Sequence, residues 1–426
     1  MRRGAKIPDK LREAIEEAVY YCGRCALCHP VCLVYQTLKH EGFSPRGRVQ
    51  LSRALLESEL RPSRALFERL QACLDCKRCI EACPSGVEVD EIVLAARGEV
   101  EGFLPLTIRA AVLMLSSPAW LAGLGLPAAS FLFRKLGLDD PNSPLRKLAF
   151  FAPPRYLPAP APRPFQSEAP EVAQPAGNPK ARVLLFPGCA FSRLMPQVAT
   201  AAMEALLRAG FEVVNPRDLR CCGAPAEHMG MHEVVEGLVE HNGGVFRRWA
   251  PDIVTTPCAS CGLTLRRHFE GEPYEVLDLS ELLVREGFEA PGGELPLRAT
   301  YHDPCHLARG QGVRDQPREI LRSIPGLEFV EMEESDRCCG GAGLFFALFP
   351  NLSIEIGRFK AEAAKAVGAE VLATWCPSCM MQLSDIVRRT GTKIAVRHVL
   401  ELLSASYAIY DGLSEPEEEA ARLRGW

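Results

Sequence analysis

The sequence predicts an α+β multidomain chain, in which a helical, cysteine-rich N-terminal domain is followed by two copies of an α/β module. Three observations favour this architecture. All 18 cysteines fall in short clusters. Ten of them form two sets of five that repeat at an offset of about 116 residues, which indicates an internal duplication. Around these two sets, short apolar runs typical of strands alternate with helical patterns, as expected for parallel α/β layers.

Composition limits the classes of protein to which the chain can belong. Its 426 residues exceed one ordinary domain. A net charge of −4 argues against a nucleic-acid binder with a broad basic face. The charged N-terminal segment lacks the apolar core of a signal peptide, so we expect a cytoplasmic protein, with association at the inner face of the cell membrane left open. For a chain that is not exported, metal ligation explains 18 thiols better than disulfides do.

Two motifs of the form C-x2-C-x2-C-x3-C lie in the first expected domain, residues 1–102. Three cysteines at steps of three are typical of a [4Fe–4S] cubane cluster, and in the two-cluster pattern the fourth ligand comes from the other motif. Zinc fits less well, because it prefers two separated cysteine pairs. We therefore expect one cubane cluster on Cys22, Cys25, Cys28 and Cys83, and a second on Cys73, Cys76, Cys79 and Cys32.

A helix is expected between the two motifs, from Pro45 to about Ser58, with Ser44 as its N-cap. Arg46 and Arg48 at its start either place positive charge beside a cluster or form ordinary surface salt bridges. Both readings remain open from the sequence.

An apolar helical segment is expected at 103–152. It has no charged residue from 110 to 133, which is long enough for a membrane span, but prolines and glycines interrupt it. Two short helices, packed in the core, on a partner or at a membrane surface, are therefore favoured. A stiff, extended, proline-rich linker follows at 153–180.

Two α/β modules are expected at 181–296 and 297–412, before an acidic, solvated tail at 413–426. The cysteines of both modules fall at strand ends and helix starts, so their thiols should meet at one edge of each sheet. The first set is Cys189, Cys221, Cys222, Cys258 and Cys261, and the second is Cys305, Cys338, Cys339, Cys376 and Cys379.

These ten cysteines, with Cys-Cys-Gly in each set, resemble the domain shared by the heterodisulfide reductase catalytic subunit and its relatives. In those relatives a module of this kind holds a non-cubane iron–sulfur cluster through five cysteines. The resemblance implies one or two further iron–sulfur clusters here, while zinc in one module remains an alternative. Over nearly its whole length the chain resembles the iron–sulfur subunit of bacterial glycolate oxidase and, less closely, that of anaerobic glycerol-3-phosphate dehydrogenase.

The resemblance implies an electron-transfer subunit of a flavin-dependent 2-hydroxy-acid (glycolate) oxidase or dehydrogenase. The sequence carries no flavin, nicotinamide or ATP motif, so an FAD-containing partner would perform the oxidation and a quinone or another carrier would receive the electrons. Glycolate oxidase subunits often lack the residues equivalent to Cys258 and Cys376, which this chain keeps. The complete sets favour the alternative of disulfide reduction at a five-cysteine cluster. A subunit of glycerol-3-phosphate or lactate dehydrogenase is a further alternative.

Four histidines lie close to these cysteines. His302 and His306 flank Cys305, where they could donate hydrogen bonds to cluster sulfur, take up protons, or shape the start of a helix. We favour the local structural role. His228 and His232 follow the first Cys-Cys-Gly and are expected at the surface. The sequence does not identify a catalytic residue.

Overall fold

The computed structural model describes residues 19–117, 130–131, 135, 155 and 158–425. The chain forms two compact units, and each is built from separate stretches of sequence. Unit 1 comprises Met1–Met114, Gly223–Gly237 and Gly340–Ile356. Unit 2 comprises Leu115–Cys222, Leu238–Cys339 and Gly357–Trp426. The chain therefore passes from unit 2 to unit 1 immediately after each Cys-Cys pair.

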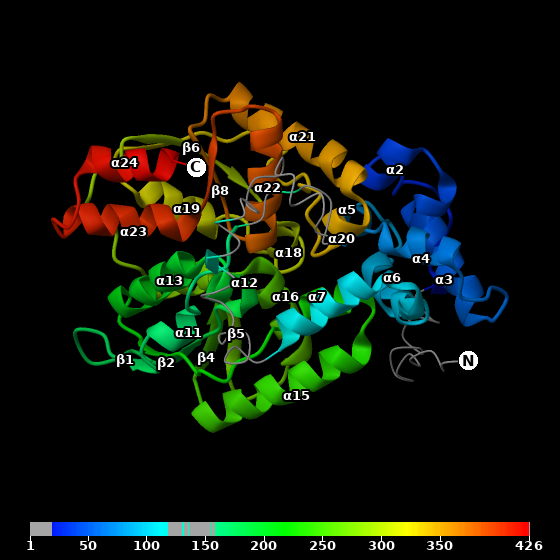
Figure 1. Cartoon of the computed structure of the whole chain (residues 1–426), viewed down its shortest axis with the longest axis horizontal. Helices are drawn as coiled ribbons and strands as arrows, with labels where there is room; N and C mark the ends of the chain where they lie inside the picture. Colours follow the sequence, from blue (N-terminus) through cyan, green and yellow to red (C-terminus); the bar gives the residue numbers. More distant parts are fainter. Residues whose placement is uncertain (1–18, 118–129, 132–134, 136–154, 156–157, 426) are drawn as a thin grey trace. The chain divides into compact units, whose positions relative to one another are not determined.

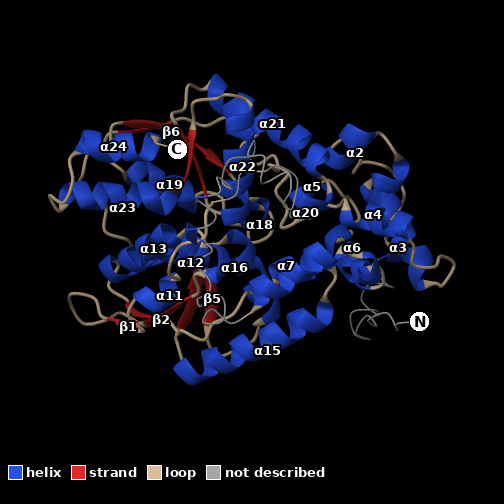
Figure 2. Ribbon diagram, in the orientation of Figure 1, coloured by secondary structure: helices blue, strands red, loops and turns tan. Residues whose placement is uncertain are grey.

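The described part of unit 1 is helical (Figures 1 and 2). The predicted helix near Pro45 is confirmed: Pro45 lies in its first turn, and the Ser44 hydroxyl accepts a hydrogen bond from the Gly47 amide at 2.9 Å. The elements of this unit are α2 (Leu33–Leu38), η1 (Glu41–Phe43), α3 (Pro45–Leu56), α4 (Arg64–Gln71), α5 (Arg78–Glu81), α6 (Val89–Gly98), η2 (Glu101–Phe103), most of α7 (Leu106–Ser116), α14 (Ala224–Met229), α20 (Phe345–Leu348) and the first parts of α15 (His232–Trp249) and α21 (Pro350–Ala366).

Unit 2 contains two sheets that share one strand order, β3-β2-β4-β5 and β7-β6-β8-β9. All these neighbours pair in parallel, so the predicted pair of α/β modules is confirmed. One more strand, β1, pairs antiparallel with β3. Figure 2 shows the strands in two groups. Their bounds are β1 (Val172–Ala173), β2 (Arg182–Leu185), β3 (Glu212–Val214), β4 (Ile253–Thr256), β5 (Glu275–Asp278), β6 (Leu297–His302), β7 (Leu327–Phe329), β8 (Val371–Thr374) and β9 (Ala395–His398).

The two modules pack on each other through a helix from each, α13 (Pro196–Arg208) and α23 (Val399–Tyr410), which lie side by side in Figure 1. The Arg208 guanidinium stacks over the Tyr407 ring at 4.4 Å, and the Ser404 hydroxyl donates to Glu204 at 2.6 Å. The other helices of unit 2 are α11 (Phe165–Glu168), α12 (Gly188–Arg193), α16 (Ala259–His268), α17 (Leu279–Glu286), α18 (Cys305–Ala308), α19 (Gln316–Ser323), α22 (Pro377–Arg389), α24 (Pro416–Arg424) and the later parts of α15 and α21.

Two segments are more ordered than the sequence led us to expect. The proline-rich stretch contributes α11 and strand β1. The acidic tail forms α24, which buries Ala420 and Leu423 and pairs Arg424 with Glu370 at 2.8 Å. Of the apolar stretch at 110–133, α7 covers the start and most of the rest lies outside the described residues. Among the residues that the structure describes, no helix has the length and apolar character needed to cross a membrane.

Candidate metal centres

The two N-terminal cysteine loops repeat an uncommon backbone conformation. Arg24 and Asp75, each two residues after the first cysteine of its motif, have φ values of 55° and 49°. Ala26 and Lys77, each one residue after the second cysteine, have φ values of 68° and 60°. Residues with a Cβ atom rarely adopt positive φ, and such strain gathers at functional sites. Its occurrence at the same two positions of both loops indicates that each loop is shaped around the same kind of bound group.

The eight N-terminal cysteines line two neighbouring cavities. In each cavity, the three-cysteine run of one motif meets the last cysteine of the other. A cubane cluster requires four thiolate ligands around one small space. The cysteines that line each cavity therefore fit a [4Fe–4S] cluster. One cavity is lined by Cys32, Cys73, Cys76 and Cys79. The other is lined by Cys22, Cys25, Cys28, Cys79 and Cys83.

Each of these cavities is also lined by an arginine of α3. Arg48 is 1% exposed and donates from Nε to the Arg69 carbonyl at 2.9 Å. Burial raises the pKa of the Cys32 thiol, and the charge of Arg48 opposes that rise. Arg46 lines the other cavity, and its Nε donates to Glu41 at 2.8 Å nearer the surface. Arg48 is therefore a buried positive charge beside thiols, whereas Arg46 combines a cavity position with a surface salt bridge.

His228 is buried, so the expected surface position is wrong for this residue. Its Nε2 lies 3.2 Å from Asp75 Oδ2, and Arg97 donates to the His228 carbonyl at 2.9 Å. Arg97 also donates to the Cys73 carbonyl at 2.7 Å. The buried guanidinium requires these acceptors, because an unpaired buried charge is strongly destabilising. Within unit 1, the segment after the first Cys-Cys pair is thereby bound to a cysteine loop. His232 is half-buried.

The structure brings the five thiols of the first module together. The β2 and β4 strands end just before Cys189 and Cys258, and the Cys221 Sγ lies 3.8 Å from that of Cys189. Cys222 is in hydrogen-bond contact with Cys221 and Cys261, and Cys261 is in contact with Cys258. Hydrogen bonds from Cys221 and then Cys261 lower the pKa of Cys222 to about 6. Soft, largely buried sulfur donors in continuous contact fit an iron–sulfur centre.

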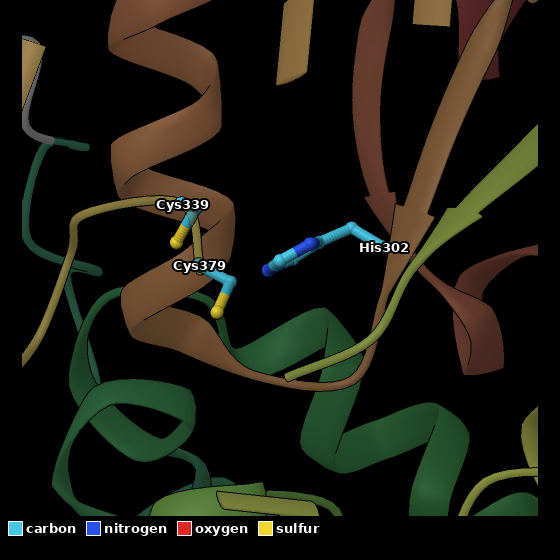
Figure 3. A group of neighbouring side chains, drawn as sticks. All are labelled: His302, Cys339 and Cys379. Atoms are coloured by element: carbon cyan, nitrogen blue, oxygen red, sulfur yellow. The ribbon is translucent and has the colours of Figure 1, made fainter. Parts of the chain in front are cut away.

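In the second module, the Cys379 thiol contacts those of Cys339 and Cys376. His302, Cys339 and Cys379 offer ligand atoms within 4.8 Å of one another. Figure 3 shows the His302 ring reaching from the end of its strand toward both thiols. Burial lowers the pKa of His302 to about 3, so the ring is neutral. Cys305 begins α18, and Cys338 is buried directly before Cys339.

The two modules meet at their thiols, a contact that the cysteine spacing did not reveal. Cys258 and Cys376, each directly before the first helix after β4 or β8, are in hydrogen-bond contact. Beside them, the Ser260 Oγ lies 3.7 Å from Cys376 Sγ and accepts or donates a 3.1 Å hydrogen bond with His306 Nδ1. The contact with Cys258, and then that with Cys379, holds the pKa of Cys376 well below its usual range. The two five-cysteine sets are therefore adjacent within unit 2.

Comparisons with known proteins agree with this geometry. The model of the cysteine-rich domain CCG matches residues 183–266 and 299–384, and that of the 4Fe-4S dicluster domain matches residues 18–87. Lactate utilization protein A of an Exiguobacterium species is 30% identical over 237 residues, which cover 52% of this chain and 96% of that protein. The chain belongs to the Cys-Cys-Gly iron–sulfur family. The predicted family resemblance is thus confirmed.

Other relatives of this Cys-Cys-Gly protein cover different shares of its length. The probable glycolate oxidase iron-sulfur subunit of Bacillus subtilis is 29% identical over 434 residues, covering 93% of this chain and 96% of that protein. A fumarate reductase (CoM/CoB) subunit of Methanothermobacter marburgensis is 39% identical over 234 residues, 54% of this chain and 47% of the relative, so the chain spans about half of that relative's length. The match to the crystal structure of a hypothetical protein from Helicobacter pylori covers 99% of this chain and 80% of that protein. The TM-score is 0.56 and the identity is 9%, so the match supports the fold alone.

Proposed function

We propose that this Cys-Cys-Gly protein is the electron-transfer subunit of a flavin-dependent 2-hydroxy-acid oxidase or dehydrogenase that acts on glycolate or lactate. The observation that carries the proposal is the crossed grouping of the eight N-terminal thiols around two cavities. This donor set suits two [4Fe–4S] clusters, which accept and release single electrons. The names of two relatives, a probable glycolate oxidase iron-sulfur subunit and lactate utilization protein A, support the substrate class.

In this proposal the chain holds the redox groups and controls their surroundings. Cys22, Cys25, Cys28 and Cys83 hold one cubane cluster, and Cys73, Cys76, Cys79 and Cys32 hold the other. The five-cysteine sets of the modules hold one or two further iron–sulfur clusters. An FAD-containing partner oxidises the hydroxy acid, because the sequence has no dinucleotide motif of its own, and a quinone or another carrier receives the electrons.

A second candidate function is reduction of a disulfide at the modules. The contact between the Cys258 and Cys376 thiols favours it, because that contact brings the two five-cysteine sets together in one buried region. One relative is named as a fumarate reductase (CoM/CoB) subunit, and the name of a reductase supports this candidate.

Metal and sulfide analysis tests the iron–sulfur assignment first. We expect the full chain, purified without oxygen, to carry at least about eight iron and eight acid-labile sulfide, the content of two cubane clusters. Near-stoichiometric zinc without sulfide would contradict both candidate functions.

Copurification and activity separate the two candidates. An associated FAD subunit, with glycolate- or lactate-dependent reduction of a dye, supports the hydroxy-acid function. Disulfide reduction without any hydroxy-acid activity supports the second candidate instead. In that case Cys258→Ser and Cys376→Ser should each abolish disulfide reduction while the electron paramagnetic resonance (EPR) signals of the N-terminal clusters remain.

A further inference from the structure

The two modules differ at one equivalent position, three residues before the first cysteine of each set. Phe186 stands three residues before Cys189 and directly follows β2, and His302 stands three residues before Cys305 and is the last residue of the equivalent strand β6. Phe186 is fully buried, and its ring centroid lies 6.2 Å from that of Phe246, so it belongs to an apolar core. His302 is 1% exposed, yet its ring points at the thiols of Cys339 and Cys379 (Figure 3). The second module therefore has a nitrogen donor at the position where the first module has an apolar ring.

Neither nitrogen of the His302 ring has a hydrogen-bond partner among the described residues. A second buried histidine, His398 at the end of β9, provides a contrast. Its Nε2 lies 3.0 Å from the Pro257 carbonyl, and its Nδ1 accepts from the Leu400 amide at 3.2 Å. An unsatisfied buried polar group costs about 1–3 kcal/mol. A metal bound to one His302 nitrogen would remove this cost for that nitrogen.

The backbone around His302 is held firmly in place. The Thr374 hydroxyl donates to the His302 carbonyl at 3.1 Å, and the Asp303 amide donates to the Ser335 carbonyl at 3.0 Å. The Asp303 carboxylate accepts two hydrogen bonds from Arg318, at 2.7 and 2.6 Å. These contacts fix the backbone from which the His302 ring extends. The fold therefore sets where the His302 ring begins, and Figure 3 shows that the ring extends from there toward the two thiols.

We propose that His302 is a nitrogen ligand of the metal centre in the second module, together with Cys339 and Cys379. The second centre then has mixed thiolate and imidazole ligation, whereas the first has thiolate ligation only. A neutral imidazole in place of an anionic thiolate raises the reduction potential of an iron–sulfur centre. The second centre is thus the one that retains electrons in preference to the first. This inference rests on the proposed function only in that the module carries a redox-active iron–sulfur centre.

Pulsed EPR of the full-length, anaerobically reduced protein tests the ligand directly. We expect a strong hyperfine coupling from a coordinated nitrogen. When the histidines carry ¹⁵N, this coupling should change as the different nuclear spin and magnetic moment of ¹⁵N predict. His302→Phe places the residue of the first module in the second and should abolish this coupling. His241→Phe is the matched control, because His241 bonds the Asp218 carbonyl near the surface at 2.8 Å. The control should keep the coupling unchanged.

A second variant covers the case in which His302→Phe does not fold. His302→Cys supplies a thiolate at the same position, so it should retain the iron, lose the nitrogen coupling and lower the midpoint potential of one centre. Where the module carries iron, the proposal is overturned if the native protein shows no such coupling, or if the coupling survives in either variant. Zinc in this module would contradict the redox function there, and zinc X-ray absorption would then decide the ligation: a nitrogen scatterer lost in His302→Cys supports it, and sulfur scatterers alone overturn it.

Discussion

Single charged side chains set the electrostatic surroundings of the two N-terminal cavities. Arg48 is buried against the Cys32 cavity, while Arg46 lies beside the other and is shared with Glu41 at the surface. A positive charge stabilises a reduced, more negative cluster, and it does so more strongly when water is excluded. The two cavities therefore have similar thiols, but the positive charge beside one is buried and the charge beside the other is partly screened by water.

Replacement of Arg48 should change the potential of one cubane cluster. Arg48→Gln removes the buried charge and retains a group that can donate to the Arg69 carbonyl. We expect the midpoint potential of the cluster at Cys32 to fall by on the order of tens of millivolts, as followed by EPR during a redox titration. Arg46→Gln is the control and should shift the other cluster by less, because solvent screens its charge. An equal shift in both variants would contradict this account.

Loss of His228 should destabilise unit 1. His228→Ala removes a ring that lies between Asp75 and Arg97, and leaves both charges in a buried region with fewer partners. We expect a loss of about 3 kcal/mol, seen as a lower midpoint in chemical denaturation monitored anaerobically. His241→Ala, near the surface, should change the stability by less than about 0.5 kcal/mol. An unchanged midpoint for His228→Ala would show that the network contributes nothing to stability.

At the scale of elements, the packing of α6 on α14 requires a glycine at position 230, because there is no room for a side chain. A Cβ atom at Gly230 would lie 2.5 Å from the Arg97 backbone carbon, and Gly230 has a φ of 79°. Both facts exclude a larger residue without movement of one helix end. Gly230→Ala should therefore lower the denaturation midpoint and release iron from unit 1.

Gly237→Ala is the control, because a Cβ atom there meets nothing within 4 Å and alanine favours a helix. A loss of stability in the control alone would refute the packing argument.

The start of α17 should make stability depend on pH. Asp278 is its N-cap, and burial raises the pKa of this carboxyl to about 7, well above the value of about 3.9 in an unfolded chain. Between these two values the folded state holds a proton that the unfolded state has lost, so stability falls as pH rises. Asp278→Asn keeps a capping oxygen and cannot ionise. We expect it to be more stable than the native protein at pH 8, by about 2–4 kcal/mol, and similar to it near pH 4, where both states of the native protein are substantially protonated. Denaturation midpoints at both pH values measure this, and equal differences at both would contradict it.

Local sequence patterns predicted most of the strands in the two modules, because a short apolar run is a short-range signal. The strands before Cys189, Cys258 and Cys376 are apolar runs that end at a cysteine, and all three are present. Strands β5 and β9 and the burial of His228 were not predicted. The partners of His228 lie more than a hundred residues away in the sequence, so no local signal could indicate its burial. The contact between Cys258 and Cys376 likewise depends on how the two modules pack, which spacing within one module does not encode.

At the scale of the whole molecule, the division into two units predicts independent metal centres. Cys76→Ser should remove one cubane EPR signal and leave the signals of the modules, because Cys76 lies in unit 1 and all ten module cysteines lie in unit 2. Cys261→Ser is the reciprocal variant and should spare the cubane signals. Simultaneous loss of all signals in either variant would show that the centres assemble as one.

The division of the chain also bears on its synthesis at the ribosome. Unit 1 contains the first hundred residues, but it also includes Gly223–Gly237 and Gly340–Ile356. The N-terminal segment therefore leaves the exit tunnel long before its last packing partners are translated. Unit 1 is therefore complete only after more than three quarters of the polypeptide has been made. A polypeptide that ends before Gly223 would contain all the residues that line the two N-terminal cysteine cavities, but it would lack the two later segments of unit 1.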